Sequence, residues 1–226
     1  MNERSLGQAN PSPARLVTTL TVAGLLSGLI IVFVFEVTLP TINAYKAKVQ
    51  REAVFKVLPG ITRFERLVYE ENRLAATIEE EVGQEFVFGG YDDQDQLVGY
   101  AIPGAGPGWQ DTISLLYGYL PQRRKVVGME ILESRETPGL GDKIYKDAAF
   151  VANFDDLSID PEIVTVKKGQ KSAPNEVDAI TGATISSKAV VRIIQQANGH
   201  WLPRLQSTEW RLQESADAAS SPGEGQ

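Results

Sequence analysis

The feature that most constrains the fold is an uncharged run near the N-terminus, LVTTLTVAGLLSGLIIVFVF, at residues 16–35. A helix rises about 1.5 Å per residue, so a run of this length matches the roughly 30 Å apolar core of a bilayer. A cleaved signal peptide has a shorter apolar stretch followed by a small-x-small cleavage site, and the sequence FEVTLPTINAY that follows has no such site. We therefore predict an uncleaved transmembrane anchor over residues 16–37, preceded by a short N-terminal segment at residues 1–15.

Two absences limit the chemistry of the chain. Its 226 residues include no cysteine and a single histidine, His200, and the formal net charge is −7. A thiolate nucleophile, a disulfide framework and a cysteine-based metal site are excluded, and one histidine argues against a multi-histidine metal centre or a Ser-His-Asp triad. The acidic charge argues against nucleic-acid binding. We predict no metal site and no catalytic residue, so any redox chemistry must come from a bound organic cofactor.

The segment at residues 38–60 predicts an amphipathic helix that connects the anchor to the rest of the chain. Its apolar residues recur on one face at helical spacing, and the Pro59-Gly60 pair marks its end.

Short runs rich in β-branched and aromatic residues, separated by turn clusters, predict an antiparallel meander. These runs are residues 85–91, 97–103, 112–120 and 126–134. A short helix around residues 145–154, a strand near residues 162–168 and a helix from about Thr184 follow. The predicted fold class is α+β, a twisted, mainly antiparallel sheet with flanking helices, preceded by one transmembrane helix. The domain covers residues 61–211, and residues 212–226, rich in Ser, Ala, Gly and Glu, form a disordered tail.

The stretch DAITGAT, Asp178 to Thr184, comes directly before the last predicted helix. Threonine and serine cap the free N–H groups of a helix, so a plain helix start is one interpretation. The same N–H groups and the positive end of the helix dipole also form an anion site, and Gly182 and Ala183 leave room for a phosphate on the backbone. On these grounds alone both interpretations stay open.

Two further segments are rich in glycine. In ETPGLG, Glu136 to Gly141, the proline fixes φ and the glycines permit positive φ and close backbone approach, as expected where a loop lies against a flat ring. A well-formed turn after a strand is the plain alternative. The loop GAGPGWQ, Gly104 to Gln110, follows one strand and precedes another without opening a helix, so it is not a dinucleotide-binding fingerprint.

The segments DAITGAT and ETPGLG carry a resemblance to a known family. The first is similar to the Asp-x-x-(Ser/Thr)-Gly-Ala-Thr signature at which a flavin transferase joins FMN to the last threonine through a phosphoester bond, and the second is that family's other signature. Behind a single anchor, the pair resembles the G subunit of Rnf (also Rsx) electron-transport complexes over nearly the full length. The family usually has a histidine two residues before the glutamate of the second signature, where this chain has Ser134.

The resemblance implies a set of cofactor-binding residues. Thr184 is the residue to which FMN is covalently joined, and its neighbours in the first signature surround the phosphate, whereas the second signature lines the flavin. The implied residues besides Thr184 are Asp178, Thr181, Gly182, Ala183, Glu136, Thr137, Leu140, Gly141, Lys143 and Trp109. Trp109 is as compatible with simple packing as with contact to the ring.

The resemblance also implies a function. The chain is expected to carry electrons on FMN within an ion-translocating ferredoxin/NAD oxidoreductase, without being catalytic alone. Its expected partners are the other membrane and peripheral subunits, and a flavin transferase during maturation. Basic residues flank both ends of the anchor and do not decide its orientation. The resemblance places residues 1–15 in the cytoplasm and the domain on the periplasmic side of the bacterial cytoplasmic membrane. The alternatives are the C subunit of a sodium-translocating NADH:quinone reductase, and a membrane-tethered sensor or structural module.

Overall fold

The structure is a computed structural model that describes residues 12–70, 73–77 and 84–220, with side chains described to residue 205. The chain divides into two units, Met1–Lys48 and Val49–Gln226. The predicted N-terminal segment at residues 1–15 therefore lies mostly outside the described residues.

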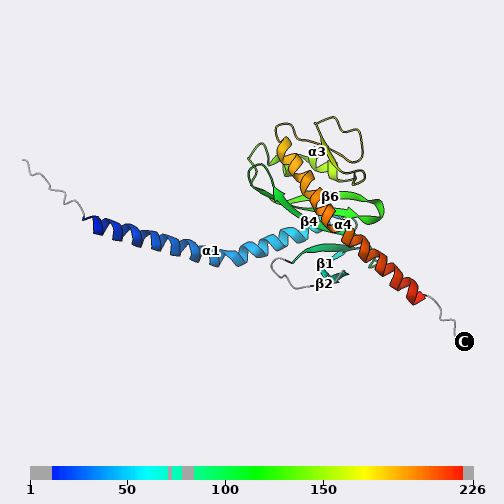
Figure 1. The fold of residues 1–226 in the computed structure, drawn as a ribbon, viewed down its shortest axis with the longest axis horizontal. Coiled ribbons are helices and arrows are strands. Elements are labelled where there is room, and N and C mark those ends of the chain that lie inside the picture. The colour runs from blue at the N-terminus through cyan, green and yellow to red at the C-terminus, as the bar shows by residue number, and fades with distance from the viewer. Residues whose placement is uncertain (1–11, 71–72, 78–83, 221–226) are drawn as a thin grey trace, which may run out of the picture. The chain divides into compact units, whose positions relative to one another are not determined.

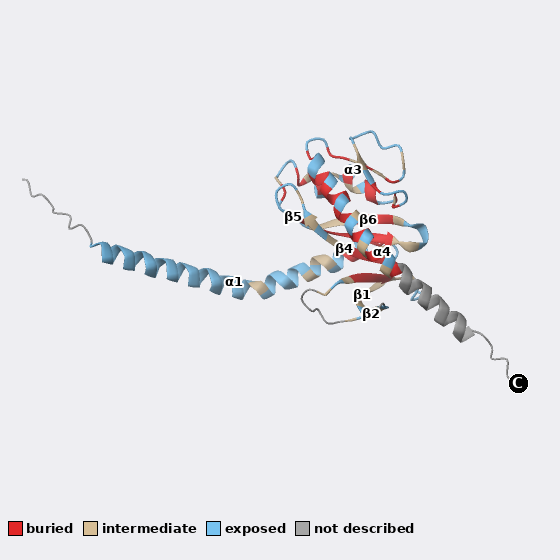
Figure 2. Cartoon of the chain, in the orientation of Figure 1, coloured by how far each residue is buried: buried red, intermediate tan, exposed pale blue. Residues whose placement is uncertain are grey.

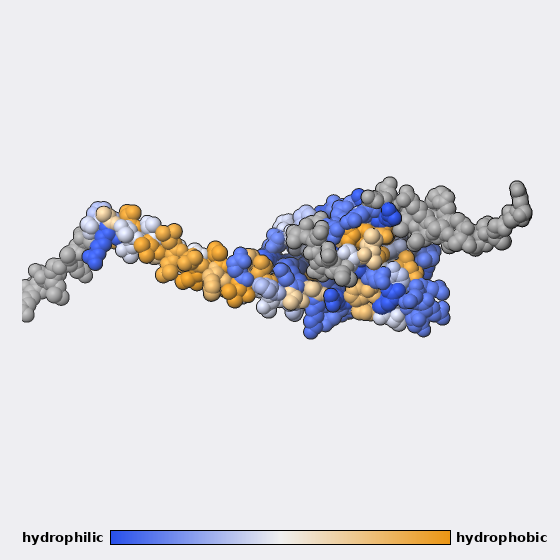
Figure 3. Space-filling model, turned by 90° about the horizontal axis from the view of Figure 1, so that it is seen from below, coloured by the Kyte–Doolittle hydropathy of each residue, from blue (hydrophilic) through white to orange (hydrophobic). Residues whose placement is uncertain are grey.

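The first unit is formed by the N-terminal part of helix α1, Pro13–Val57. The large apolar side chains of this part are exposed, and they form a continuous apolar band in Figure 3. Its most apolar window has a mean hydropathy of 2.4, and among the described residues α1 is the one helix long and apolar enough to cross a membrane. The anchor and the connecting segment, predicted as two helices, are one helix with Pro40 inside it. A proline interrupts the helical hydrogen bonding only locally, so the pattern resumes after it.

The second unit is built on a sheet of seven strands within the described residues, in the order β2-β1-β3-β4-β5-β6-β7, with all neighbours antiparallel (Figure 1). The strands are β1 Arg63–Glu70, β2 Arg73–Ala76, β3 Phe86–Tyr91, β4 Leu97–Pro107, β5 Thr112–Leu120, β6 Lys125–Glu133 and β7 Leu157–Ser158. The predicted α+β class with a mainly antiparallel sheet is confirmed. The four predicted strands correspond to β3–β6, but β1 was missed because its charged residues obscure the apolar alternation.

Helices cover both faces of this sheet. One face packs against α4, Thr184–Ser220, together with the short helices α2, Lys143–Lys146, and α3, Ala148–Val151. The opposite face packs against Ala53, Val54 and Val57 at the end of α1 and against Leu58, which follows it. Figure 2 shows α4 with a buried side against the sheet and an exposed side away from it. Fully burying one large aliphatic side chain contributes about 1.5–3 kcal/mol, so these two layers hold the domain together.

Three smaller elements complete the fold. The 3-10 turns η1, Pro121–Arg123, and η2, Ala152–Phe154, follow β5 and α3. Strands β8, Val164–Val166, and β9, Glu176–Asp178, pair in parallel as a separate two-stranded sheet. The strand predicted near residues 162–168 is therefore present, and it pairs with β9, which ends at Asp178, the first residue of DAITGAT.

Two boundaries differ from the sequence prediction. Residues 104–107 of the predicted glycine-rich loop belong to β4, because they pair with residues 112–115 of β5. Glycine is needed at position 104 because a Cβ there would be 2.8 Å from Ile193 Cγ2 of α4. Only the turn closed by the Gly108 N–H to Asp111 O hydrogen bond remains a loop. At the other end, α4 runs to Ser220 and overlaps the predicted tail at 212–226, whose last six residues lie outside the described residues.

Candidate cofactor site

The two sequence signatures meet at one cavity of about 380 Å³. It is enclosed by the turn after β4, the segment after β6 and the start of α4. Its lining residues are Trp109, Thr137, Leu140, Gly141, Gly182, Ala183, Thr184, Ile185 and Ser186. Seven of the eleven residues predicted to bind the cofactor thus lie around one space, although they come from distant parts of the sequence. Ile185 and Ser186 also line it and were not predicted.

Glu136 joins the three segments from behind the cavity. Its side chain is buried, and the residue is only 5% exposed. Its carboxylate accepts hydrogen bonds from the Trp109 and Gln110 N–H groups, each at 2.9 Å, and from the hydroxyl of Ser186 on α4. Gly141 passes so close that a Cβ there would lie 2.8 Å from the Glu136 Cβ. Glu136 does not itself line the cavity. Its hydrogen bonds hold in place the three segments that do.

Hydrogen bonding keeps Glu136 ionised in this buried position. Burial on its own would raise the pKa of the carboxyl group, but the hydrogen bonds from Ser186 and from the N–H groups of Gln110, Asp111 and Trp109 outweigh it and hold the pKa below its usual value. Ser134, which stands where the family usually has histidine, accepts a 3.3 Å hydrogen bond from the Glu136 N–H. The serine therefore supports the same glutamate through its backbone.

Ser186 is the residue that sequence reasoning should have found. It is 3% exposed and lies three positions before Ala189, on the buried face of α4. A hydroxyl on the apolar face of a helix needs a polar partner. That requirement was a signal for a buried acceptor, and the acceptor is Glu136.

The segment Thr137-Pro138-Gly139-Leu140 forms a turn that presents its last side chain to the cavity. The Leu140 N–H donates to Thr137 O at 3.2 Å, and Gly139 has a φ of +77°. Proline followed by a glycine at this φ is the pattern of a type II turn. The Thr137 hydroxyl donates to Gln110 Oε1 at 2.9 Å, which fixes the turn to the loop after β4.

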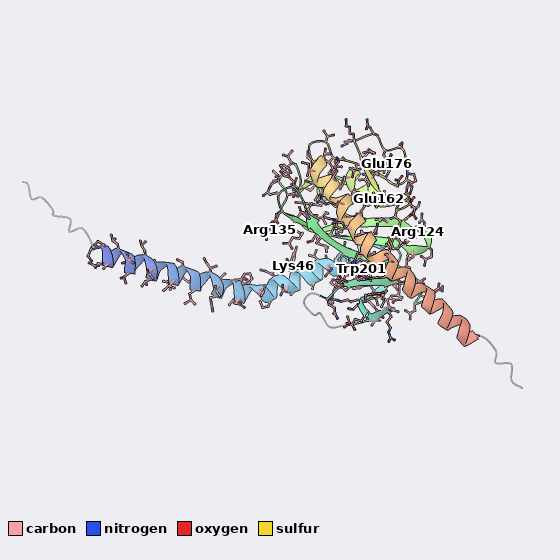
Figure 4. The ribbon with its side chains drawn as sticks, in the orientation of Figure 1. Lys46, Arg124, Arg135, Glu162, Glu176 and Trp201 are labelled. Atoms are coloured by element: carbon pink, nitrogen blue, oxygen red, sulfur yellow. The ribbon has the colours of Figure 1, made fainter. Side chains whose placement is uncertain are left out.

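Large apolar side chains stand exposed around the opening of the cavity. Trp109 is 67% exposed, Leu140 50% and Ile185 52%. Exposed apolar groups gathered at a concave site are typical of a binding surface. Beside this surface, Arg135, two residues after β6 (Figure 4), has its Nη1 3.8 Å from Asp111 Oδ2, in an exposed ion pair.

Thr184 is the first residue of α4, as predicted, and its side chain is exposed. Gly182 has a φ of +84°, a conformation that favours glycine, and turns the chain into the helix. The buried Ser187 stabilises this turn, since its hydroxyl donates to Ala183 O at 2.9 Å and accepts from the Ile180 N–H at 3.1 Å. The first N–H groups of a helix have no partner within the helix, so they are available to an anion bound beside Thr184.

The remaining predicted residues lie outside this cavity. Thr181 lines a neighbouring cavity, whereas Lys143, at the start of α2, lines neither. Asp178 ends β9, and its Oδ1 accepts from the Gln170 and Lys171 N–H groups at 3.2 and 3.1 Å. Its carboxylate therefore holds the turn between β8 and β9, a role that the sequence did not indicate.

This geometry sets an expectation for Asp178. The family resemblance implies that Asp178 serves flavin attachment more than the fold, so that Asp178→Ala would leave the melting temperature nearly unchanged. The two hydrogen bonds revise that expectation, and Asp178→Ala should lower the free energy of unfolding by about 1 kcal/mol. Asp178→Asn retains an oxygen acceptor and should melt near the wild type. Thermal denaturation of the two variants checks this, and an alanine variant as stable as the asparagine variant would contradict it.

A family model described as FMN-binding domain matches residues 108–198, a range that contains all three segments of the cavity. The fold and the site thus define an FMN-binding domain.

The G subunit of the Na⁺-translocating ferredoxin:NAD⁺ oxidoreductase complex of Acetobacterium woodii is 33% identical over 68% of this chain and 74% of its own length. The G subunit of an ion-translocating oxidoreductase complex of Methanosarcina acetivorans is 29% identical over 81% of this chain and 91% of its own length. The chain belongs to this family of G subunits, so the resemblance identified from sequence is confirmed.

A solved structure supports the fold. The C subunit of the Na⁺-translocating NADH-quinone reductase of Parabacteroides distasonis has a TM-score of 0.57 and 22% identity, over 69% of this chain and 90% of that chain. At this identity the likeness shows the fold alone. Together with the exposed apolar helix α1, membership of the G-subunit family makes the chain a membrane-anchored subunit of a larger complex.

Proposed function

We propose that Thr184 Oγ1 is joined to the phosphate of FMN and that the flavin ring lies in the cavity beside Trp109, Leu140 and Ile185. The observation that carries this proposal is the single cavity in which the two signatures meet, with an exposed Thr184 at its edge. The residues fit the cofactor, since exposed apolar side chains suit a flat ring and free helix N–H groups suit a phosphate. The flavin ring supplies the electron chemistry when bound.

Each part of the site then has a defined task. Thr184 supplies the oxygen that a flavin transferase uses to attach the cofactor. In this step the bond between Oγ1 and the flavin phosphorus would form as the pyrophosphate bond of a flavin dinucleotide donor breaks. The adenosine monophosphate half would leave, and the hydroxyl proton would go to solvent. Glu136 keeps the surrounding segments in place, and Trp109 and Leu140 would shield the bound ring from water.

The function of the whole chain is to carry electrons on FMN within an ion-translocating ferredoxin/NAD oxidoreductase, together with other membrane and peripheral subunits. The A. woodii relative bears this activity in its name and supports the proposal. The chain supplies binding and position for the cofactor and is not an enzyme alone. The C subunit of an NADH-quinone reductase is less well supported, since the likeness there is confined to the fold.

Flavin fluorescence on a denaturing gel tests the attachment. The full chain is coexpressed with a flavin transferase, denatured, and viewed before staining. A fluorescent band at the mass of the chain is expected, because only a covalent cofactor stays with the denatured protein. A dark band, with flavin released into solution, would support a domain that binds FMN without a covalent bond.

The orientation of the domain is a further part of the proposal. Residues 37–226 are proposed to lie on the periplasmic side of the bacterial cytoplasmic membrane, where lost cofactor could not be replaced and a covalent bond is useful. The absence of cysteine agrees with an oxidising compartment. Alkaline phosphatase fused after Gln226 should be active, and a fluorescent reporter that folds only in the cytoplasm should be dark. The opposite pattern would place the domain in the cytoplasm.

A further inference from the structure

A second cavity, of about 540 Å³, lies beside the first and shares Gly182 and Thr184 with it. Its lining differs in chemistry. The lining of the first cavity contains no charged side chain, whereas three lysines, Lys167, Lys168 and Lys188, line the second, with no acidic residue in its lining. Thr184 thus stands between an apolar cavity and a basic one.

The helix geometry places Lys188 next to Thr184. Residues four positions apart share one face of a helix, with their Cβ atoms about 5–6 Å apart. Both side chains are exposed and both line the basic cavity. The Lys188 ammonium group can therefore reach an anion carried by the Thr184 oxygen.

The other two lysines come from the turn after β8, which the first signature itself holds in place. β8 pairs with β9 so that Val166 stands opposite Asp178. The Gln170 N–H donates to Lys167 O at 2.9 Å and also to the Asp178 carboxylate at 3.2 Å. The aspartate of the DAITGAT signature therefore positions the turn that carries Lys167 and Lys168.

Three like charges around one cavity repel one another in the absence of an anion. Among the described residues, the one acidic group within ion-pair distance of these lysines is Asp147, 3.9 Å from Lys168. A phosphodiester carries one negative charge, which would turn this repulsion into attraction.

We propose that Lys188, with Lys167 and Lys168, binds the phosphate that links the flavin to Thr184. The phosphate then lies on the basic side of Thr184 and the ring on the apolar side. This inference rests on the proposed attachment of FMN, and it assigns to the lysines a site for a phosphodiester anion.

Substitution of the lysines should slow attachment without affecting the fold. Lys188→Gln is expected to lower the rate of flavin attachment about fivefold, on the order expected of one solvent-exposed charge pair. The triple variant with Lys167→Gln and Lys168→Gln should be slower still, whereas Lys188→Arg keeps the charge and most of the rate. Lys56→Gln is the matched control, because Lys56 is an exposed lysine that lines neither cavity and pairs with Glu130.

The experiment has two readouts on the full chain. The first is the rate of flavin attachment by purified transferase, followed by intact mass. The second is the extent of lysine acetylation by a small amine-reactive reagent, compared between the flavin-loaded wild type and the unloaded Thr184→Val variant. The flavin-loaded chain should show protection of Lys188, Lys167 and Lys168, with Lys56 labelled equally in both.

The outcomes separate this inference from the function on which it rests. A wild type that acquires no covalent flavin would overturn the attachment, and the inference with it. A wild type that is loaded normally, while the triple variant is loaded at the same rate and the three lysines are labelled equally in both forms, would overturn the inference alone. Slower flavin attachment in the lysine variants, together with protection of the three lysines from acetylation in the loaded wild type, would confirm that they bind the phosphate.

Discussion

The Thr184→Val variant is expected to lose all covalent flavin while keeping its fold. Valine has nearly the volume of threonine but has no hydroxyl oxygen for the phosphoester. Because the Thr184 side chain is exposed, the change should alter the free energy of unfolding by no more than about 0.5 kcal/mol. The measurement is flavin fluorescence of the denatured chain on a gel, with a thermal melt of the same preparation.

Two conservative variants serve as controls for this result. Thr184→Ser retains a hydroxyl at the attachment position, and Thr181→Ser retains one at the other threonine of the signature, so both should keep covalent flavin. A fluorescent band from Thr184→Val would show that the cofactor is attached elsewhere. A valine variant that fails to fold would show that Thr184 stabilises the start of α4.

The Glu136→Ala variant should have the largest effect on stability. It removes the acceptor of the Trp109 and Gln110 N–H groups and of the buried Ser186 hydroxyl. A buried donor without a partner costs about 1–3 kcal/mol, so we expect a loss of about 3 kcal/mol in the free energy of unfolding. Glu136→Gln keeps the shape and one oxygen acceptor, and should lose less. Denaturant unfolding of both variants checks this, and an alanine variant within about 0.5 kcal/mol of wild type would contradict the positioning role.

The same residue predicts a pH dependence. The pKa of Glu136 is lowered on folding from its ordinary value of 4.5, so its ionised form stabilises the folded state. This contribution is fully present above the unfolded-state pKa and is lost as the pH falls through the lower pKa of the folded state. The stability difference between wild type and Glu136→Gln should therefore be constant at neutral pH and shrink as the pH falls below about 4.5. A difference that stays constant over this range would show that the charge of Glu136 contributes nothing.

Local sequence patterns were sufficient for much of the fold. The apolar run of α1, the strands β3–β6 and the start of α4 at Thr184 follow from periodicity and from turn residues that act over short distances. The two signatures were also sufficient to predict most of the cavity lining. The family resemblance paired them, and the fold then brought both to one place.

Long-range contacts account for what the sequence did not reveal. Glu136 was predicted to line the flavin, but its carboxylate is directed to Ser186 and to the loop after β4, which only the folded chain brings near. Asp178 acts through the parallel pairing of β8 and β9, and β9 was not predicted. The lysine-lined cavity depends on the same pairing, because Lys167 and Lys188 come together only once β8 lies beside the start of α4.

Peptide mass spectrometry of the full chain, coexpressed with a flavin transferase and digested after denaturation, tests the attachment of FMN to Thr184. The peptide containing Thr184 should be heavier by one FMN less one water, and its fragment ions should place this mass on Thr184. An unmodified Thr184 peptide, from a preparation whose flavin is released on denaturation, would contradict it.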